Sequence, residues 1–169
     1  MQPIILKIRL YGDPCLRKKS IPVPEITASE RMLIQSMIET MRRNKGVGLA
    51  APQVGINQRI FVAETGEGLV VISNPKILKK AGSVVMEEGC LSIPGVTVKV
   101  KRPEKIWVKF LDENSQPVEE NYEGLMARVF QHETDHLDGK LIIDYAGVGE
   151  RRKLKQKLDD IKKSQNLAL

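Results

Sequence analysis

The stretch LMARVFQHETDHLDG, residues 125–139, combines a helical pattern of apolar residues with both histidines of the chain. The apolar residues keep helical spacing as far as Leu137, and Gly139 is a natural C-terminal stop. His132 and His136 are four residues apart, so a helix places both on one face. The stretch therefore predicts a helix that carries two histidines side by side.

Sequence patterns elsewhere predict further helices and several strands around this helix. Residues 28–44 repeat apolar side chains every four positions (Leu33, Met37 and Met41), which is typical of an amphipathic helix. Five β-rich runs follow, and they are RIFVAE (59–64), LVVISNP (69–75), SVVMEEG (83–89), VTVKVKRP (96–103) and KIWVKFLDENSQPV (105–118). The second run is closed by Asn-Pro. The order of elements predicts an α+β fold, with antiparallel β-sheets packed around the central helix and a helix at each end.

Length and composition favour one globular domain over residues 1–169. The chain has 169 residues, of which 41% are hydrophobic and 28% charged. No run approaches the roughly 18 apolar residues of a membrane span, and no targeting pattern is visible, so we expect a cytoplasmic protein that does not enter membranes. Two cysteines are too few for a disulfide framework, and a bond between Cys15 and Cys90 is disfavoured.

The formal charge of +6 is concentrated near the C-terminus, where residues 146–169 predict a basic helix. Within it, Leu154, Leu158 and Ile161 form an apolar stripe that would dock the helix. Aromatic residues, at 4%, are too sparse to predict a sequence-specific reader of nucleic acid. The basic residues are interpreted as a solvated face, or alternatively as an anchor to the ribosome through RNA phosphates.

The histidine pair predicts a metal site with a working base. Glu133 follows the first histidine and would project beside the metal, where it can take a proton from water. A catalytic site needs a third protein ligand and one open position. Glu150 is the only downstream candidate, whereas Cys90, in MEEGCLSIPG, offers a thiolate upstream that suits zinc and other soft divalent ions. A lone cysteine can also be a buried packing residue.

A glycine-rich stretch, GVGLAAPQVG at residues 46–55, follows the first helix. Its glycines let a substrate chain lie against bare backbone, and Gln53 carries an amide donor. Taken alone, the stretch is equally a turn that leads into a strand.

Together, GVGLAAPQVG, EEGCLSIPG and QHETDHLDG resemble, in this order and spacing, the three signature motifs of peptide deformylase. The resemblance runs from YGDPCLR at residues 11–17 to GKLIIDY at residues 139–145. It implies an enzyme that removes the formyl group from the initiator methionine of nascent proteins.

The resemblance also implies a role for each motif residue. The implied metal ligands are Cys90, His132 and His136. Glu133 is implied as the general acid and base, and Gln53 with the backbone N–H of Leu91 as the pair that holds the carbonyl oxygen. Iron(II) is implied as the native metal, with zinc, nickel or cobalt able to occupy the site.

The substrate implied by this resemblance is a formylmethionine peptide. The methionine side chain is expected in an apolar pocket, with Leu91, Leu125 and Val129 as candidate walls. The expected substrate-binding residues are Val47, Gly48, Gly89, Leu125 and Val129. Asp135, between the histidines, is interpreted as a partner for a cation or as a residue that orients a ligand, and Arg102 is a candidate partner.

Two other functions are compatible with parts of the pattern. One is a zinc endopeptidase that uses His132, His136 and Glu150, and the other is a basic binding module with a structural metal. Only the deformylase interpretation uses both the EEGCLS and the GVGLAAPQ stretches.

Overall fold

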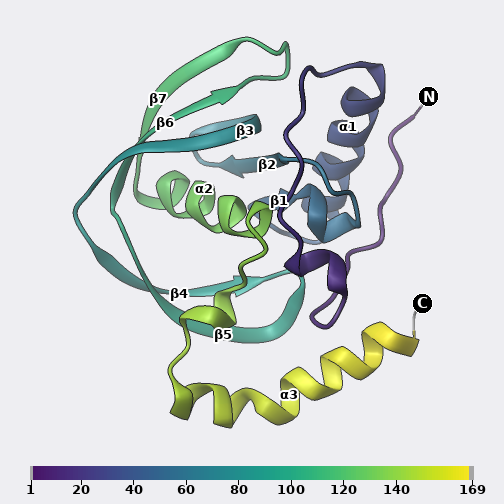
Figure 1. The fold of residues 1–169 in the computed structure, drawn as a ribbon, viewed down its shortest axis with the longest axis vertical. Coiled ribbons are helices and arrows are strands. Elements are labelled where there is room, and N and C mark those ends of the chain that lie inside the picture. Colours follow the sequence, from purple (N-terminus) through teal and green to yellow (C-terminus); the bar gives the residue numbers. More distant parts are fainter. Residues whose placement is uncertain (1, 168–169) are drawn as a thin grey trace.

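The computed structural model describes residues 2–167, and its centre is the helix α2 (Gly124–Leu137). Two antiparallel sheets enclose this helix, one on each side (Figure 1). The predicted α+β architecture around a central helix is therefore confirmed. No helix within residues 2–167 is long and apolar enough to cross a membrane.

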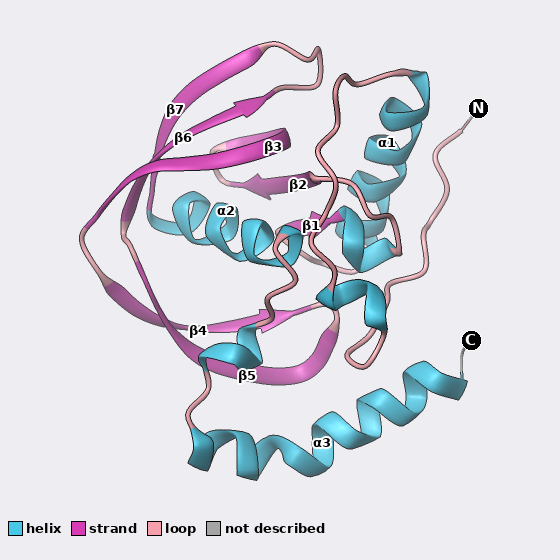
Figure 2. Cartoon of the chain, in the orientation of Figure 1, coloured by secondary structure: helices cyan, strands magenta, loops and turns pink. Residues whose placement is uncertain are grey.

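Three α-helices and three short 3₁₀ helices make up the helical part of the described chain (Figure 2). Besides α2, the α-helices are α1 (Ala28–Arg43) and α3 (Val148–Leu167). The 3₁₀ helices are η1 (Pro14–Arg17), η2 (Ala51–Val54) and η3 (Ile142–Tyr145).

The larger sheet has five strands in the order β1-β2-β3-β6-β7, and the smaller one pairs β4 with β5. The strands of the larger sheet are β1 (Gly48–Ala50), β2 (Ile60–Thr65), β3 (Gly68–Ala81), β6 (Lys105–Leu111) and β7 (Pro117–Glu123). The smaller sheet consists of β4 (Val84–Cys90) and β5 (Ile93–Arg102). In Figure 1 the strands β4 and β5 pass on one side of α2, while β2 and β3 pass on the other.

The first helix forms where the apolar period predicts it. Thr27 caps its N-terminus and forms a capping box with Glu30. Met37 and Met41 are fully buried in the core beneath it. Ser36 and Thr40, also buried, accept hydrogen bonds from the backbone of the N-terminal segment, which satisfies their hydroxyl groups.

The prediction that Asn-Pro closes the second β-rich run is wrong, because β3 continues through these residues to Ala81. Asn74 takes a positive φ of 51°, which asparagine tolerates better than most residues. Its side chain exchanges two hydrogen bonds with the backbone of Val23. The register shifts between Ser73 and Lys76, so Pro75, which has no N–H, lies in an irregularity that interrupts the strand without ending it.

The C-terminal helix α3 lies against the outer side of β5 (Figure 1). Leu158 and Ile161 are buried in an apolar cluster with residues of β5, and Leu154 packs against the same cluster, which confirms the predicted docking stripe. Near the end of α3, Gln165 bonds both the backbone N–H of Leu10 and the carboxylate of Asp13. The basic helix is thus fastened to the body of the protein at both apolar and polar points.

Candidate metal centre

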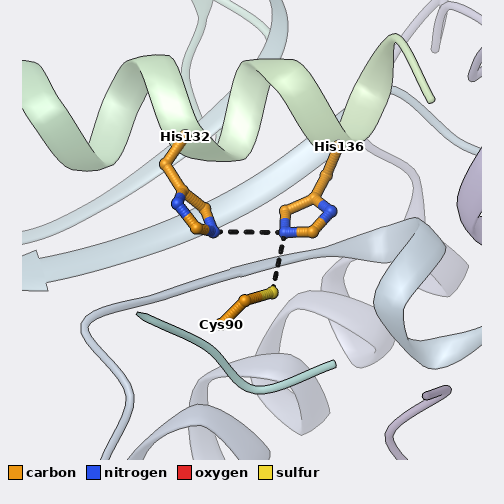
Figure 3. Close-up of side chains that lie close together, drawn as sticks. All are labelled: Cys90, His132 and His136. Atoms are coloured by element: carbon orange, nitrogen blue, oxygen red, sulfur yellow. Dashed lines mark hydrogen bonds between the residues drawn. The ribbon is translucent and has the colours of Figure 1, made fainter. Parts of the chain in front are cut away.

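The helix α2 presents both histidines on the side that faces β4. Phe130, on another face of the helix, is fully buried and meets Phe61 of β2 edge to face, with ring centroids 5.2 Å apart. This packing fixes the rotation of the helix about its axis. His132 and His136 are four residues apart on the helix, and their Nε2 atoms lie 3.2 Å apart (Figure 3).

Cys90, the last residue of β4, completes the group from the opposite side. Its Sγ lies 3.3 Å from Nε2 of His136 (Figure 3), and the three candidate ligand atoms lie within 4.8 Å of one another. With metal bonds of about 2.0–2.3 Å, two ligands of a tetrahedral ion are separated by roughly 3.5 Å. The group therefore fits one ion.

Glu150, the alternative third ligand of the sequence analysis, does not join this group, and neither does the second cysteine. Among residues 2–167, Glu150 and Cys15 are absent from the group of possible metal ligands. The Cys15 thiol instead donates to the carbonyl of Pro52, at 3.4 Å. Both cysteines are free thiols, as expected.

The two imidazoles have opposite electrostatic environments. Burial alone would lower the pKa of His132, but hydrogen bonds with Cys90 and Glu88 outweigh it and raise the pKa well above 6.5. Burial and the neighbouring His132 lower the pKa of His136 well below 6.5. Because metals bind neutral imidazoles, a bound metal would compete with the proton on His132.

Glu88, which the sequence interpretation did not single out, orients His132. Its Oε2 lies 2.9 Å from Nδ1 of that ring, which leaves Nε2 free for a metal. The same carboxylate accepts two hydrogen bonds from Arg102, at 2.6 and 2.9 Å, and one from Arg128, at 2.6 Å. Burial alone would raise the pKa of Glu88, but the hydrogen bonds from His132 and Arg102 lower it to about 2. The strand alternation contained a signal, since Glu88 lies two residues before Cys90 and faces the same way.

Asp135 pairs with Arg102, as the sequence analysis proposed. Nη1 of Arg102 donates to Oδ2 of Asp135 at 2.9 Å. The Tyr145 hydroxyl donates to the same carboxylate oxygen at 2.6 Å. Tyr145 was not predicted to take part, and no pattern in its own stretch of sequence indicates it.

Glu133 lies beside the ligand group and is not part of it. Its side chain is 4% exposed, and burial raises its pKa to about 7, which is near the operating range of a general base. Oε2 is buried without a hydrogen-bond partner among the described residues. A Cβ at position 48 would overlap the Glu133 carboxylate, so glycine at this position leaves the space that the carboxylate occupies.

Gln53 and Leu91 both lie next to Cys90. The side-chain carbonyl of Gln53 accepts a hydrogen bond from the backbone N–H of Ala50 at 2.8 Å. This bond directs the side-chain amide nitrogen toward Cys90. That nitrogen lies 3.5 Å from Sγ of Cys90 and 3.3 Å from the Ser92 hydroxyl. Leu91 follows Cys90 directly in the turn between β4 and β5.

A cavity of about 550 Å³ opens onto this group. Gln53, Leu91, Cys90, His132 and Glu133 line it together with the five residues predicted to bind substrate, which are Val47, Gly48, Gly89, Leu125 and Val129. Nine further lining residues were not predicted, and Met86 and Arg128 are among them. Met86 lies on the cavity wall and is half exposed, and Arg128 is almost fully buried.

A Cys-His-His ligand group beside a buried carboxylate, in a cavity large enough for a peptide end, defines a metal-dependent hydrolase. The pattern of the polypeptide deformylase family matches residues 5–152. The peptide deformylase of Halothermothrix orenii is 53% identical over 142 residues, 83% of this chain and 92% of that protein. That of Thermotoga maritima is 49% identical over 156 residues, 92% of this chain and 95% of that protein.

Solved structures agree with these relatives. The crystal structure of the peptide deformylase from Thermus thermophilus superposes with a TM-score of 0.90 at 42% identity and covers 95% of this chain and 99% of that one. That from Legionella pneumophila gives a TM-score of 0.88, also at 42% identity, with 96% and 98% covered. The chain belongs to the peptide deformylase family.

Proposed function

We propose that the chain hydrolyses the N-formyl group of formylmethionine at the start of nascent polypeptides and releases formate. The observation that carries the proposal is the grouping of Cys90, His132 and His136 beside Glu133, where Cys90, His132 and Glu133 line a cavity that glycines also line. Family membership supports the same reaction. Since its substrate emerges from ribosomes, the enzyme would act in the cytoplasm.

Glu133 would carry the proton in this reaction. A divalent ion bound by the ligand group would supply positive charge for the formyl oxygen and lower the pKa of water from 15.7 to about 7. The Glu133 carboxylate would accept the proton of the attacking water and pass it to the departing amine, a transfer worth roughly 10²–10⁴-fold in rate. A base with a pKa of about 7 can both accept and return a proton at neutral pH.

Gln53 and Leu91 would stabilise the charge that develops on the formyl oxygen. The Gln53 amide already points toward Cys90, and the N–H of Leu91 is one residue beyond that ligand. A single donor of this kind contributes about 3 kcal/mol to transition-state stabilisation. Because the carbon of a formamide bears only hydrogen, a narrow site can admit it and exclude acetyl groups.

The cavity would take the methionine side chain. Leu91, Leu125 and Val129 offer apolar walls, while Val47, Gly48 and Gly89 offer backbone to the peptide. An apolar pocket distinguishes side chains by only ~1–3 kcal/mol per methylene, so related apolar side chains should also be accepted.

We propose iron(II) as the native metal, with zinc, nickel or cobalt able to replace it. A thiolate and two imidazoles suit several divalent ions, and iron is the ion that the deformylase resemblance implies. The test is metal analysis of protein purified without air, together with formate release from a formyl-Met tripeptide. Release of formate by the iron form would support the proposal, whereas a metal-loaded protein that cuts internal peptide bonds without releasing formate would support the endopeptidase alternative.

We further propose that the exposed cations of α3 hold the enzyme near the ribosome through RNA phosphates. The helix is docked by its buried residues, and its basic residues are exposed, although Lys157 and Arg151 also bond backbone carbonyls of the body. The exposed cations are Arg151, Arg152, Lys153, Lys155, Lys157, Lys162 and Lys163. Each phosphate contact makes such binding more sensitive to salt.

Charge substitution tests this anchor better than truncation, because truncation would also remove the buried residues of α3. A variant with glutamine at Arg152, Lys153, Lys155 and Lys163 should lose ribosome co-sedimentation at low salt. A matched variant with glutamine at four lysines of β3 and β6 loses the same charge; these lysines are Lys76, Lys79, Lys80 and Lys109. Equal pelleting of the two variants would rule out α3 as the anchor.

A further inference from the structure

We propose that Tyr145 is a positioning residue for the metal ligand His132 and controls how tightly the protein retains its metal. Tyr145 lies at the end of η3, 13 residues beyond His132 in the sequence, and is 41% exposed. A continuous line of hydrogen-bonded side chains joins the two residues. This inference rests on the metal site proposed above and assigns a role to a residue outside it.

The outer half of the line joins Tyr145 to Arg102. The Tyr145 hydroxyl donates to Oδ2 of Asp135 at 2.6 Å, and Nη1 of Arg102 donates to the same oxygen at 2.9 Å. The guanidinium also lies over the tyrosine ring, with Cζ 4.9 Å from the ring centroid. Asp135 therefore contacts one edge of the Arg102 guanidinium, and the Tyr145 ring covers one of its faces.

The inner half of the line joins Arg102 to the ligand. Nε and Nη2 of Arg102 form a two-point contact with the Glu88 carboxylate, and Oε2 of Glu88 binds Nδ1 of His132 at 2.9 Å. A two-point contact transmits orientation, because turning the guanidinium plane turns the carboxylate with it. Arg102 and Glu88 are only 4% and 6% exposed, so water competes little for these bonds.

This geometry predicts that removal of the Tyr145 hydroxyl weakens metal retention without abolishing it. Arg128 holds Glu88 independently, through Oε1 at 2.6 Å, so the carboxylate keeps one support when the outer half is weakened. Loss of a partner that directly supports a metal-ligating histidine costs about 10–100-fold in metal affinity. Tyr145 lies two hydrogen bonds beyond Glu88 by its direct contact with Arg102, and three by way of Asp135. We expect an increase of about 3–10-fold in the rate of metal loss when its hydroxyl is removed.

The test compares Tyr145→Phe with Tyr122→Phe in cobalt(II)-loaded protein. Both substitutions remove one phenolic oxygen, and Tyr122 also packs near α2, with its ring 5.8 Å from that of Phe130, but it lies outside the line. We expect faster cobalt loss to a chelator and shifted cobalt absorption bands for Tyr145→Phe, with neither change in Tyr122→Phe. Unchanged loss rates and spectra in Tyr145→Phe, or equal changes in both variants, would overturn the proposal.

A double-substitution cycle separates positioning from general stability. Tyr145 contacts the Arg102 guanidinium through Asp135, by a direct hydrogen bond from Nη1 at 3.4 Å and through its ring, so all of its routes to His132 pass through Arg102. If Tyr145 acts along this line, then Tyr145→Phe should change cobalt loss little in an Arg102→Lys background, which lacks the two-point contact with Glu88. Additive effects would mean that Tyr145 acts by another route and would overturn the proposal. Since the readout is metal retention, a wild-type protein that holds cobalt but releases no formate refutes the deformylase assignment alone, whereas one that binds no cobalt refutes both.

Discussion

At the scale of single residues, the two histidines of the site are held in different ways. Nδ1 of His132 is bonded to Glu88, whereas Nδ1 of His136 is buried without a partner in the described part of the chain. The pKa of His136 is lowered, so it is already the neutral form that binds metals. His132 would have to give up its proton to bind a metal, and the Glu88 carboxylate would keep the ring oriented.

Cys90→Ser should remove most of the metal and nearly all deformylation, because an alcohol oxygen is a far poorer ligand than a thiolate for soft divalent ions. Cys15→Ser is the control. The Cys15 thiol makes a hydrogen bond to Pro52, and burial raises its pKa to about 12, so it stays protonated and outside the metal group. Metal content after desalting and formate release would be measured together. Equal metal content in wild type and Cys90→Ser would contradict the assignment.

Glu133→Ala should separate binding from chemistry. The carboxylate is not one of the grouped ligands, so the variant should keep its metal. Its kcat should fall ~10²-fold or more because the general base is gone. Metal content and single-turnover rates check both statements. Loss of the metal, or full activity with the metal in place, would show that Glu133 has another role.

At the scale of elements, the site joins one strand to one helix. The strand β4 brings Glu88 and Cys90 on the same face, and α2 brings His132, Glu133 and His136. The positions of the helix residues could be predicted from sequence, because a period of 3.6 fixes which residues share a face. The position of β4 beside α2 could not be predicted from sequence. It depends on pairing with β5 and on packing against α2, which are contacts between distant segments.

Acidification should lower the free energy of unfolding less in the Glu88→Gln variant than in the wild-type protein. The folded-state pKa of about 2 lies below the ordinary value of 4.5, so the unfolded chain binds this proton more tightly. The contribution of Glu88 is therefore complete above pH 4.5 and is lost as the pH falls toward 2, and it amounts to at most about 3 kcal/mol. The variant should be less stable than wild type at neutral pH, and its free energy of unfolding should fall less when the pH is lowered. Urea unfolding at several pH values measures this, with the exposed neighbour Glu87→Gln as the control; parallel pH curves for the two variants would contradict the role of Glu88.

At the scale of the whole molecule, local patterns predicted more of the elements than of their arrangement. The bounds of α1 and α2 were predicted to within one residue, because both helices have a clear apolar face. The division into two sheets and the order β1-β2-β3-β6-β7 were not predicted, since register and strand order depend on long-range pairing. The line from Tyr145 to His132 was missed for the same reason: its members lie far apart in the sequence and meet only in the folded chain.

The docking of α3 gives the last prediction. Leu158 is 7% exposed and packs with Ile161 in the apolar cluster beside β5. Leu158→Ala should lower the free energy of unfolding by about 2–3 kcal/mol, the lower part of the range for a buried leucine, because this site lies near the surface and can relax.

The same substitution should leave activity almost unchanged. Among described residues, none of α3 lines the cavity, so kcat/KM per folded molecule should stay within about twofold, a change of less than half a kcal/mol. Lys155→Ala, on the exposed side of the same helix, controls for the loss of side-chain length and should change stability by less than about 0.5 kcal/mol. Urea unfolding and formate release would be measured on the same samples. Equal stability of the two variants would mean that α3 is not held by its apolar stripe, and a large loss of kcat/KM in folded Leu158→Ala would mean that α3 shapes the site through β5.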